Sequence, residues 1–217
     1  MIDWLCRACQ QPQVAWSDVP PDRTCHACRD RQAAAATAEQ TAGIPPGYRG
    51  LTRQSWEKRF GRSWPARAAA WSGSPHWFAT YGPTGTGKTG LATVLLAEHL
   101  RTGRRGRWIS GAELSRRIQL NFSAADEVLS PLLVTGLLVL DEPFTGAATD
   151  WYIERLGLIC RTRDERRLPT VVTAQELPEL FAKTPPGAPP ALLSRMLSGI
   201  RLPLKGDDVR LLRQEPA

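Results

Sequence analysis

The stretch "GPTGTGKT", residues 82–89, determines the class of fold that this chain adopts. It follows an apolar run, "WFATY" (77–81), and leads into a helix-prone run, "TGLATVLLAEHLRTG" (89–103). A glycine-rich turn between a strand and a helix lets backbone N–H groups surround a phosphate, and the start of the helix adds positive charge. The spacing G-x-x-x-x-G-K-[ST] in this context predicts a nucleotide-binding phosphate loop.

Two side chains of this loop have a defined chemistry. The Lys88 ammonium reaches the β- and γ-phosphates of a nucleoside triphosphate, and the Thr89 hydroxyl ligates magnesium. Backbone amides of the loop form a nest for the phosphates. The predicted cofactor-binding residues are Gly82, Pro83, Thr84, Gly85, Thr86, Gly87, Lys88, Thr89 and Gly90.

A second apolar run, "LLVLDE" (137–142), ends in two acids. A strand that ends there places Asp141 beside the magnesium ion. Glu142 then polarises an attacking water, which is a poor nucleophile and has to be oriented. A kinase would not need this second acid, so the pattern predicts hydrolysis of a nucleoside triphosphate.

Short apolar runs alternate with helix-prone stretches through the rest of the chain. The predicted strands are residues 77–81, 107–110, 137–142, 170–174 and 200–204. Residues 150–165 read as an amphipathic helix, and Ser110 with Glu113 has the spacing of a capping box. Wholly apolar strands that alternate with helices predict an α/β fold, a parallel sheet with helices on both faces.

The first part of the chain holds four of the five cysteines, as two CxxC pairs separated by 15 residues. Two residues between thiols let both sulfurs reach one ion, and two such pairs supply the four ligands of a structural zinc site. We therefore predict zinc ligation by Cys6, Cys9, Cys25 and Cys28. A site closed by four thiolates has no open position for catalysis, so its role is structural or the docking of a partner.

An alanine-rich run, 29–43, predicts a helix that Pro45 and Pro46 prevent from continuing. The boundary divides the chain into a zinc-binding module with its linker helix, residues 1–43, and an ATPase domain, residues 44–217. No secretory signal opens the chain and no apolar run is long enough to span a membrane, so we expect a cytoplasmic protein without a membrane partner.

The net charge of +7 is concentrated around the phosphate loop. Residues 45–127 hold 13 basic and 5 acidic side chains, whereas the flanking segments are close to neutral. Such a field indicates contact with a nucleic acid, although a well-solvated surface is the alternative, and for "RTGRRGR" (101–107) both readings stay open. Four tryptophans lie among these basic residues; we favour core packing over base stacking for Trp56, Trp64, Trp71 and Trp77.

The phosphate loop extended to "GPTGTGKTGLA", with "LLVLDE", "LPTVVTAQEL" and "LLSRMLSGIRLPLKGDDVR", resembles the AAA+ ATPases of the DnaC/DnaI helicase-loader and IstB group. "GIPPGYRG" is similar to the segment that precedes the ATPase core in those proteins. The resemblance covers roughly residues 44–212 and keeps the order and spacing of the motifs. It implies an AAA+-type fold whose C-terminal lid is short or absent.

The resemblance also implies roles for three further residues. Gln175 stands where the family has the sensor-1 asparagine, and Arg195 in "LLSRM" matches the arginine finger. Such a finger completes the nucleotide site of a neighbouring subunit, so it implies self-association through the ATPase domain. Arg210 in "DDVR" falls at the position of the sensor-2 arginine.

By this resemblance the protein is expected to bind ATP with magnesium, to hold single-stranded DNA and to load the replicative DNA helicase. Its zinc module would dock the helicase, because some loaders carry a cysteine-rich amino-terminal domain. Two alternatives stay open: an IstB-type ATPase that regulates DNA transposition, and an adaptor that binds ATP without hydrolysing it.

Overall fold

The computed structural model describes residues 2–15, 19–121, 124–144, 149–175 and 190–209 of the 217-residue chain. Its centre is a five-stranded parallel sheet in the order β4-β5-β6-β3-β7. The strands are β3 (Trp77–Tyr81), β4 (Gly106–Ser110), β5 (Leu137–Asp141), β6 (Thr170–Ala174) and β7 (Ile200–Pro203). Each lies on a predicted strand, and the bounds differ by one residue at most.

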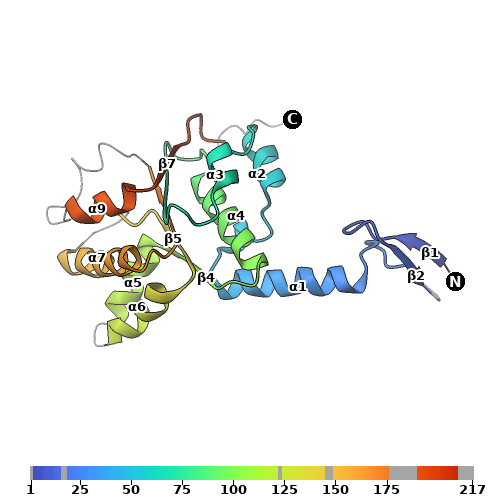
Figure 1. Cartoon of the computed structure of the whole chain (residues 1–217), viewed down its shortest axis with the longest axis horizontal. Helices are drawn as coiled ribbons and strands as arrows, with labels where there is room; N and C mark the ends of the chain where they lie inside the picture. The colour runs from blue at the N-terminus through green and yellow to red at the C-terminus, as the bar shows by residue number, and fades with distance from the viewer. Residues whose placement is uncertain (1, 16–18, 122–123, 145–148, 176–189, 210–217) are drawn as a thin grey trace.

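Helices cover both faces of the sheet, as predicted (Figure 1). Val139 and Val171 pack on one face, whereas the adjacent Leu140 and Val172 pack on the other. Because both faces are buried, these strands are apolar throughout instead of alternating. The first face is covered by α2 (Arg53–Phe60), α3 (Ala66–Ala70) and α4 (Lys88–Arg101), and the second by α5 (Gly111–Leu120), α6 (Ala125–Val134), α7 (Asp150–Glu165) and α9 (Pro190–Leu197).

The predicted capping box is half correct. The Ser110 hydroxyl accepts a hydrogen bond from the Glu113 backbone N–H at 3.1 Å and caps α5. The Glu113 carboxylate, however, pairs with Arg116 at 2.8 Å and Arg117 at 2.6 Å. These hydrogen bonds lower the pKa of Glu113 to about 2. Charge-assisted bonds to arginines one turn away are stronger than a bond to a neutral backbone amide, which explains the difference.

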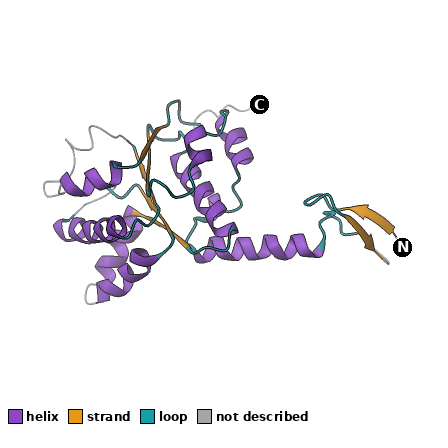
Figure 2. Cartoon of the chain, in the orientation of Figure 1, coloured by secondary structure: helices purple, strands orange, loops and turns teal. Residues whose placement is uncertain are grey.

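The amino-terminal segment begins with an antiparallel hairpin of β1 (Ile2–Leu5) and β2 (Pro12–Ala15). Helix α1 (His26–Thr41) then starts three residues earlier than the predicted run, so that Cys28 lies in its first turn. Its 16 residues span about 24 Å, and Figure 2 shows the hairpin at the far end of this helix from the sheet. A short 3₁₀ helix, η1 (Pro46–Tyr48), follows.

The end of α1 is fixed to the α/β core. The buried Glu39 carboxylate accepts a hydrogen bond from the Gly50 N–H at 2.7 Å and pairs with Arg101 of α4 at 3.6 Å. The Ala42 carbonyl accepts from the Trp108 N–H at 2.7 Å. The division of the chain at residue 44 stays a prediction, but these contacts attach the helix before it to α4 and β4. Within the described residues, no helix is both long and apolar enough to cross a membrane.

A buried arginine joins α7 to the loops that precede β5 and β6. Arg163 is 0% exposed and donates hydrogen bonds to the carbonyls of Leu132, Thr135 and Pro169 at 2.6–2.9 Å and to the Thr170 hydroxyl at 2.8 Å. Burial lowers the pKa of Arg163 to about 10, which leaves it charged at neutral pH. The guanidinium therefore satisfies polar atoms that would otherwise be buried without partners.

Replacing Arg163 tests this role. We expect Arg163→Met to lower the free energy of unfolding by about 3 kcal/mol, because it leaves several buried acceptors unpaired. Arg161→Met, on the exposed side of the same helix, should change it by less than about 0.5 kcal/mol. Urea denaturation at neutral pH measures both, and equal losses in the two variants would contradict the assigned role.

Candidate functional site

The phosphate loop leaves the carboxyl end of β3 in a conformation that requires glycine. Gly82, Gly85 and Gly87 have φ angles of 144°, 75° and 96°, which other residues rarely adopt. A Cβ at Gly82 would also collide with the Leu204 carbonyl, and one at Gly85 with the Asp208 carboxylate. The loop therefore depends on these glycines for its backbone path as well as for space.

Lys88 lies inside the loop. Its ammonium donates to the carbonyls of Gly82 at 2.8 Å and Pro83 at 2.7 Å, and the residue is 4% exposed. The Thr86 hydroxyl also donates to Pro83, at 2.8 Å. The oxygens of a bound triphosphate would compete for the same ammonium, because charge-assisted bonds to phosphate are stronger than bonds to neutral carbonyls. Phosphate binding by Lys88 stays a prediction that this position favours.

Asp141 ends β5 next to the start of α4. One of its carboxylate oxygens, Oδ1, accepts hydrogen bonds from the Thr89 hydroxyl at 2.9 Å and from the Thr173 hydroxyl at 2.7 Å. Burial raises the pKa of the Asp141 carboxyl, and the bonds from Thr173 and Thr89 oppose this rise. A cation at this position would favour the ionised form.

The donor set fits magnesium. Two oxygen ligands at about 2.1 Å on adjacent corners of an octahedron are about 3 Å apart. The distance of 2.9 Å between Thr89 Oγ1 and Asp141 Oδ1 agrees with that separation. The sequence did not identify Thr173 as a site residue, although its hydroxyl fixes the orientation of Asp141. The alternation of side chains along β6 and its adjacency to β5 are the signals that predict this contact.

Glu142 and Gln175 lie at the same end of the sheet. Glu142 follows β5 with a φ of 48°, a strained conformation for a residue other than glycine, and its N–H donates to the Thr173 hydroxyl at 2.9 Å. The Gln175 amide nitrogen is 3.5 Å from a Glu142 carboxylate oxygen. Both predicted side chains line the cavity beside the phosphate loop, and their catalytic roles stay predictions.

A cavity of about 230 Å³ opens beside the phosphate loop. Loop residues 84–85 and 87–90, with Glu142 and Gln175, form one side of it. Tyr48, Arg59, Phe60 and Val209 complete its wall, and none of these four was predicted as a nucleotide-site residue. The Arg59 guanidinium lies 5.9 Å from the Tyr48 ring centre and 5.8 Å from that of Phe60. The loop thus adjoins an aromatic and basic surface large enough for part of a nucleotide.

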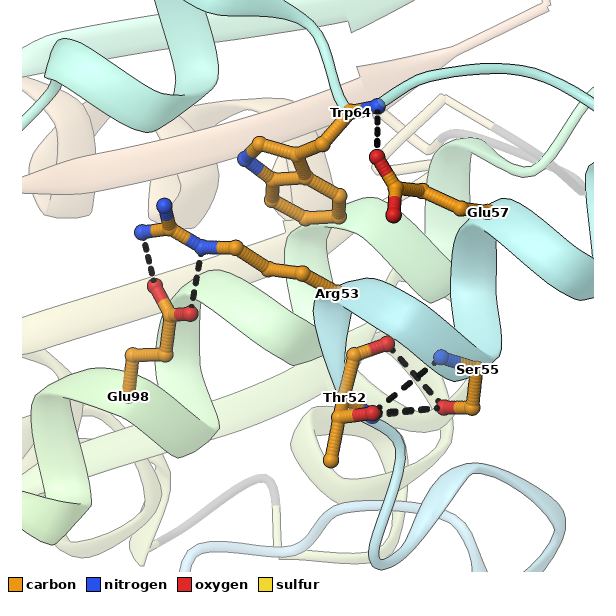
Figure 3. A network of polar contacts seen from close by, with 6 residues as sticks. All are labelled: Thr52, Arg53, Ser55, Glu57, Trp64 and Glu98. Carbon is orange, nitrogen blue, oxygen red and sulfur yellow. Dashed lines mark hydrogen bonds and ion pairs between the residues drawn. The ribbon is translucent and has the colours of Figure 1, made fainter.

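Helix α2 holds this wall in place (Figure 3). Thr52 caps the helix in a reciprocal box with Ser55, and the Glu57 carboxylate accepts from the Trp64 N–H at 2.6 Å. Arg53 forms a two-bond ion pair with Glu98 of α4, at 2.6 and 2.7 Å. These contacts fix the position of α2 relative to the helix that begins in the phosphate loop.

Trp56 connects α2 to the loop itself. Its ring is fully buried, and its indole N–H donates to the Gly87 carbonyl at 3.0 Å. Trp71 and Trp77 are also buried and Trp64 is partly buried against the same core, so the favoured interpretation of these tryptophans as packing residues is confirmed.

Among the comparisons with known proteins, the search of solved structures found proteins of a similar fold. No known family model matches the sequence, and no curated protein matches it. Among solved structures, the DnaC helicase loader is 22% identical with a TM-score of 0.54, over 64% of this chain and 84% of that one. DnaI is 20% identical with a TM-score of 0.53, over 71% and 81% of the two chains.

A replication initiator DnaA bound to AMPPCP and single-stranded DNA is 20% identical with a TM-score of 0.57, over 76% of this chain. This chain spans about half of that DnaA chain, 51%. The chain has the fold of an AAA+ ATPase domain. The predicted fold class is therefore confirmed.

Arg195 does not reach the pocket of its own domain. It lies on α9 and pairs with Asp164 of α7 at 3.4 Å. The other Asp164 oxygen accepts from the Trp77 indole at 2.8 Å and lies 2.9 Å from the His76 ring nitrogen. Trp77 is the first residue of β3, so Arg195 lies near the end of that strand opposite the phosphate loop, about 16 Å away along it.

Asp164 is ionised where it pairs with Arg195. Partial burial opposes its ionisation, but hydrogen bonds from His76 and Trp77 and the nearby Arg195 charge together lower the pKa of Asp164. Arg195 is 34% exposed at the end of the domain away from its own phosphate loop, which is compatible with the finger implied by the resemblance. Arg210, the implied sensor-2 residue, lies outside the described residues.

The four amino-terminal cysteines converge in one cluster. Their sulfur atoms all lie within 4.8 Å of one another, and Cys9 Sγ is 3.9 Å from Cys25 Sγ. Four thiolates around zinc at about 2.3 Å are about 3.8 Å apart, so the donor set fits this ion. The first pair lies on the turn after β1, and the second spans the first turn of α1, with Cys25 as its N-cap.

Hydrogen bonds from a backbone N–H and from an arginine favour thiolates in the cluster, whereas the neighbouring sulfurs disfavour them. The Cys25 N–H donates to Cys6 Sγ at 3.3 Å and lowers the pKa of the Cys6 thiol to about 6. Contacts with the neighbouring sulfurs, first Cys25, raise the pKa of Cys28 to about 12, although the Arg31 guanidinium donates to it at 3.1 Å. Four sulfurs this close cannot all ionise without a cation among them, which supports metal binding.

Proposed function

We propose that this protein is an ATP-dependent DNA replication protein that binds single-stranded DNA and loads the replicative hexameric helicase. The observation that carries the proposal is the Thr89–Asp141 contact beneath a glycine-rich loop, in an AAA+ fold shared with a helicase loader. A solved DnaA of the same fold binds AMPPCP and single-stranded DNA, which supports ATP and DNA as ligands here.

In the proposed reaction, the loop amides and Lys88 bind the triphosphate, and Thr89 with Asp141 would hold magnesium. The ion would neutralise charge on the phosphates. Glu142 orients the attacking water, and the Gln175 amide positions Glu142 or the γ-phosphate. Thr173 keeps Asp141 aimed at the metal position through its 2.7 Å hydrogen bond.

The second part of the proposal is assembly. Arg195 inserts into the site of a neighbouring subunit and stabilises the transition-state charge, an effect worth roughly 10³–10⁵ in rate for such fingers. Its position at the opposite end of β3 from the phosphate loop suits a head-to-tail arrangement of subunits.

The third part is helicase docking by a zinc-binding module. The cysteine cluster lies at the far end of α1 from the ATPase core (Figure 1). Most of α1 is exposed, and a polar exposed helix is typical of a connection between two separate units. An exposed module on such an arm suits the capture of a partner protein.

A mixing experiment tests hydrolysis and assembly together. We expect Arg195→Ala and Glu142→Gln to abolish DNA-stimulated ATP turnover when each is assayed alone. Mixing the two should restore part of the wild-type rate, because a Glu142→Gln subunit lends its Arg195 to an intact site. Steady-state phosphate release measures this. No recovery on mixing, or full activity of Arg195→Ala alone, would contradict a finger supplied by the neighbour.

Capture of the helicase tests the docking step. We expect Cys25→Ser to lose bound zinc and to retain less than a tenth of the wild-type amount of replicative helicase in co-purification, while nucleotide binding persists. Cys160→Ser, which changes a thiol buried in α7, serves as the matched control and should retain both. Undiminished helicase capture by zinc-free Cys25→Ser would contradict docking through this module.

A further inference from the structure

Two loops at the amino-terminal ends of the sheet strands carry exposed arginines that the nucleotide site does not use. Arg104 and Arg105 precede β4, and Arg166 and Arg167 lie between α7 and β6. We call these residues the four-arginine cluster. All four side chains are exposed, and the segments 102–105 and 165–169 include one acid, Glu165, so that their net charge is +3.

The two loops lie on either side of β5. The Arg105 carbonyl accepts a hydrogen bond from the Leu137 N–H at 3.2 Å, and the Pro169 carbonyl accepts from the Leu138 N–H at 3.1 Å. Because β4 and β6 are the two neighbours of β5, about 10 Å separates the backbones of the two loops where they meet β5. The two pairs thus lie at the amino-terminal ends of the strands, and the phosphate loop lies at the carboxyl ends.

No carboxylate among the described residues neutralises the charge of this cluster. In the part of the chain that the structure describes, none of the four arginines forms an ion pair with a carboxylate. Other arginines of the same region do pair: Arg101 with Glu39, Arg195 with Asp164, and Arg155 with Asp126. The charge of Arg104 also contributes, after burial, to lowering the pKa of His99.

Arg167 has a backbone conformation that disfavours arginine. It follows the C-cap of α7 with a φ of 51°, in the left-handed region, and its N–H bonds to the Asp164 carbonyl at 3.0 Å. Glycine is preferred at this position, and Gly103 occupies the equivalent place after α4 with a φ of 78°. An arginine there costs roughly 1 kcal/mol, and such strain is a sign of function at exposed positions.

We propose that the four-arginine cluster binds the phosphate backbone of single-stranded DNA. The inference rests on the proposed function, and it places the DNA contact at the amino-terminal ends of the strands, opposite the end that would bind the nucleotide. All four side chains are arginine and none is lysine, and the planar guanidinium matches the geometry of phosphate oxygens. No base-stacking aromatic belongs to the cluster, so the contact follows the backbone and is independent of sequence.

Salt-dependent binding tests the cluster in the full-length protein. The probe is a fluorescein-labelled oligothymidylate, followed by anisotropy between about 50 and 200 mM salt. We expect Arg166→Gln/Arg167→Gln to weaken binding about tenfold and to make the log–log salt slope shallower by about 1.4, the loss of two single-strand phosphate contacts. The control, Arg201→Gln/Lys205→Gln, removes the same charge from exposed residues at and after β7 and should leave the slope unchanged.

A single variant separates binding from folding. Arg167→Gly relieves the left-handed strain, so we expect weaker DNA binding without loss of melting temperature. Wild-type protein that does not bind the oligonucleotide would overturn the DNA role and the cluster together. Normal wild-type binding with an unchanged slope in both cluster variants would overturn the cluster alone. Competition by polyglutamate at equal charge would assign the surface to an acidic protein instead and also overturn the proposal.

Discussion

The hydrogen bonds that converge on Asp141 are the constraint on which the site depends. Thr89 lies in the first turn of α4, Asp141 ends β5 and Thr173 belongs to β6, so this one carboxylate joins three elements that are far apart in sequence. In a parallel sheet all carboxyl ends lie on one side, and the loops that follow them form the ligand site there. The order β5-β6-β3 then brings the acid to the phosphate loop across one intervening strand.

The same topology gives the two ends of the parallel strands different side chains. The carboxyl ends of the strands carry the buried Lys88 and Asp141 and the cavity, whereas the loops before the strands expose Arg104, Arg105, Arg166 and Arg167. Arg195 also lies toward the amino-terminal ends, fixed by Asp164. Nucleotide and polyanion would therefore meet opposite ends of the strands, and β3, which runs from Trp77 to the phosphate loop, connects them.

Much of this arrangement could be predicted from the sequence, for physical reasons. The phosphate loop has an unambiguous spacing, and strands buried on both faces are continuous apolar runs. The cysteine cluster could also be predicted, because the spacing of two ligands in each CxxC pair is a local feature of the sequence. The sequence analysis did not predict helices α2, α3 and α6. Helices α2 and α3 are only eight and five residues long, and Pro131 interrupts the pattern of α6.

The rest required the tertiary structure. Arg59 and Phe60 reach the cavity because α2 packs on α4, and nothing in their local sequence indicates that contact. Arg163 occurs in an amphipathic helix, where an arginine is usually exposed, yet it is buried among carbonyl groups. The position of Arg195 depends on an acid 31 residues earlier in the chain.

Calorimetric titration with ATP, in the presence and absence of magnesium, tests the central claim that Lys88, Thr89 and Asp141 share one magnesium-bound triphosphate. We predict that wild-type protein binds ATP more tightly with magnesium, that Lys88→Ala weakens binding about tenfold or more, and that Asp141→Asn removes the magnesium dependence. An affinity that is the same for all three proteins, with or without the ion, would contradict the account.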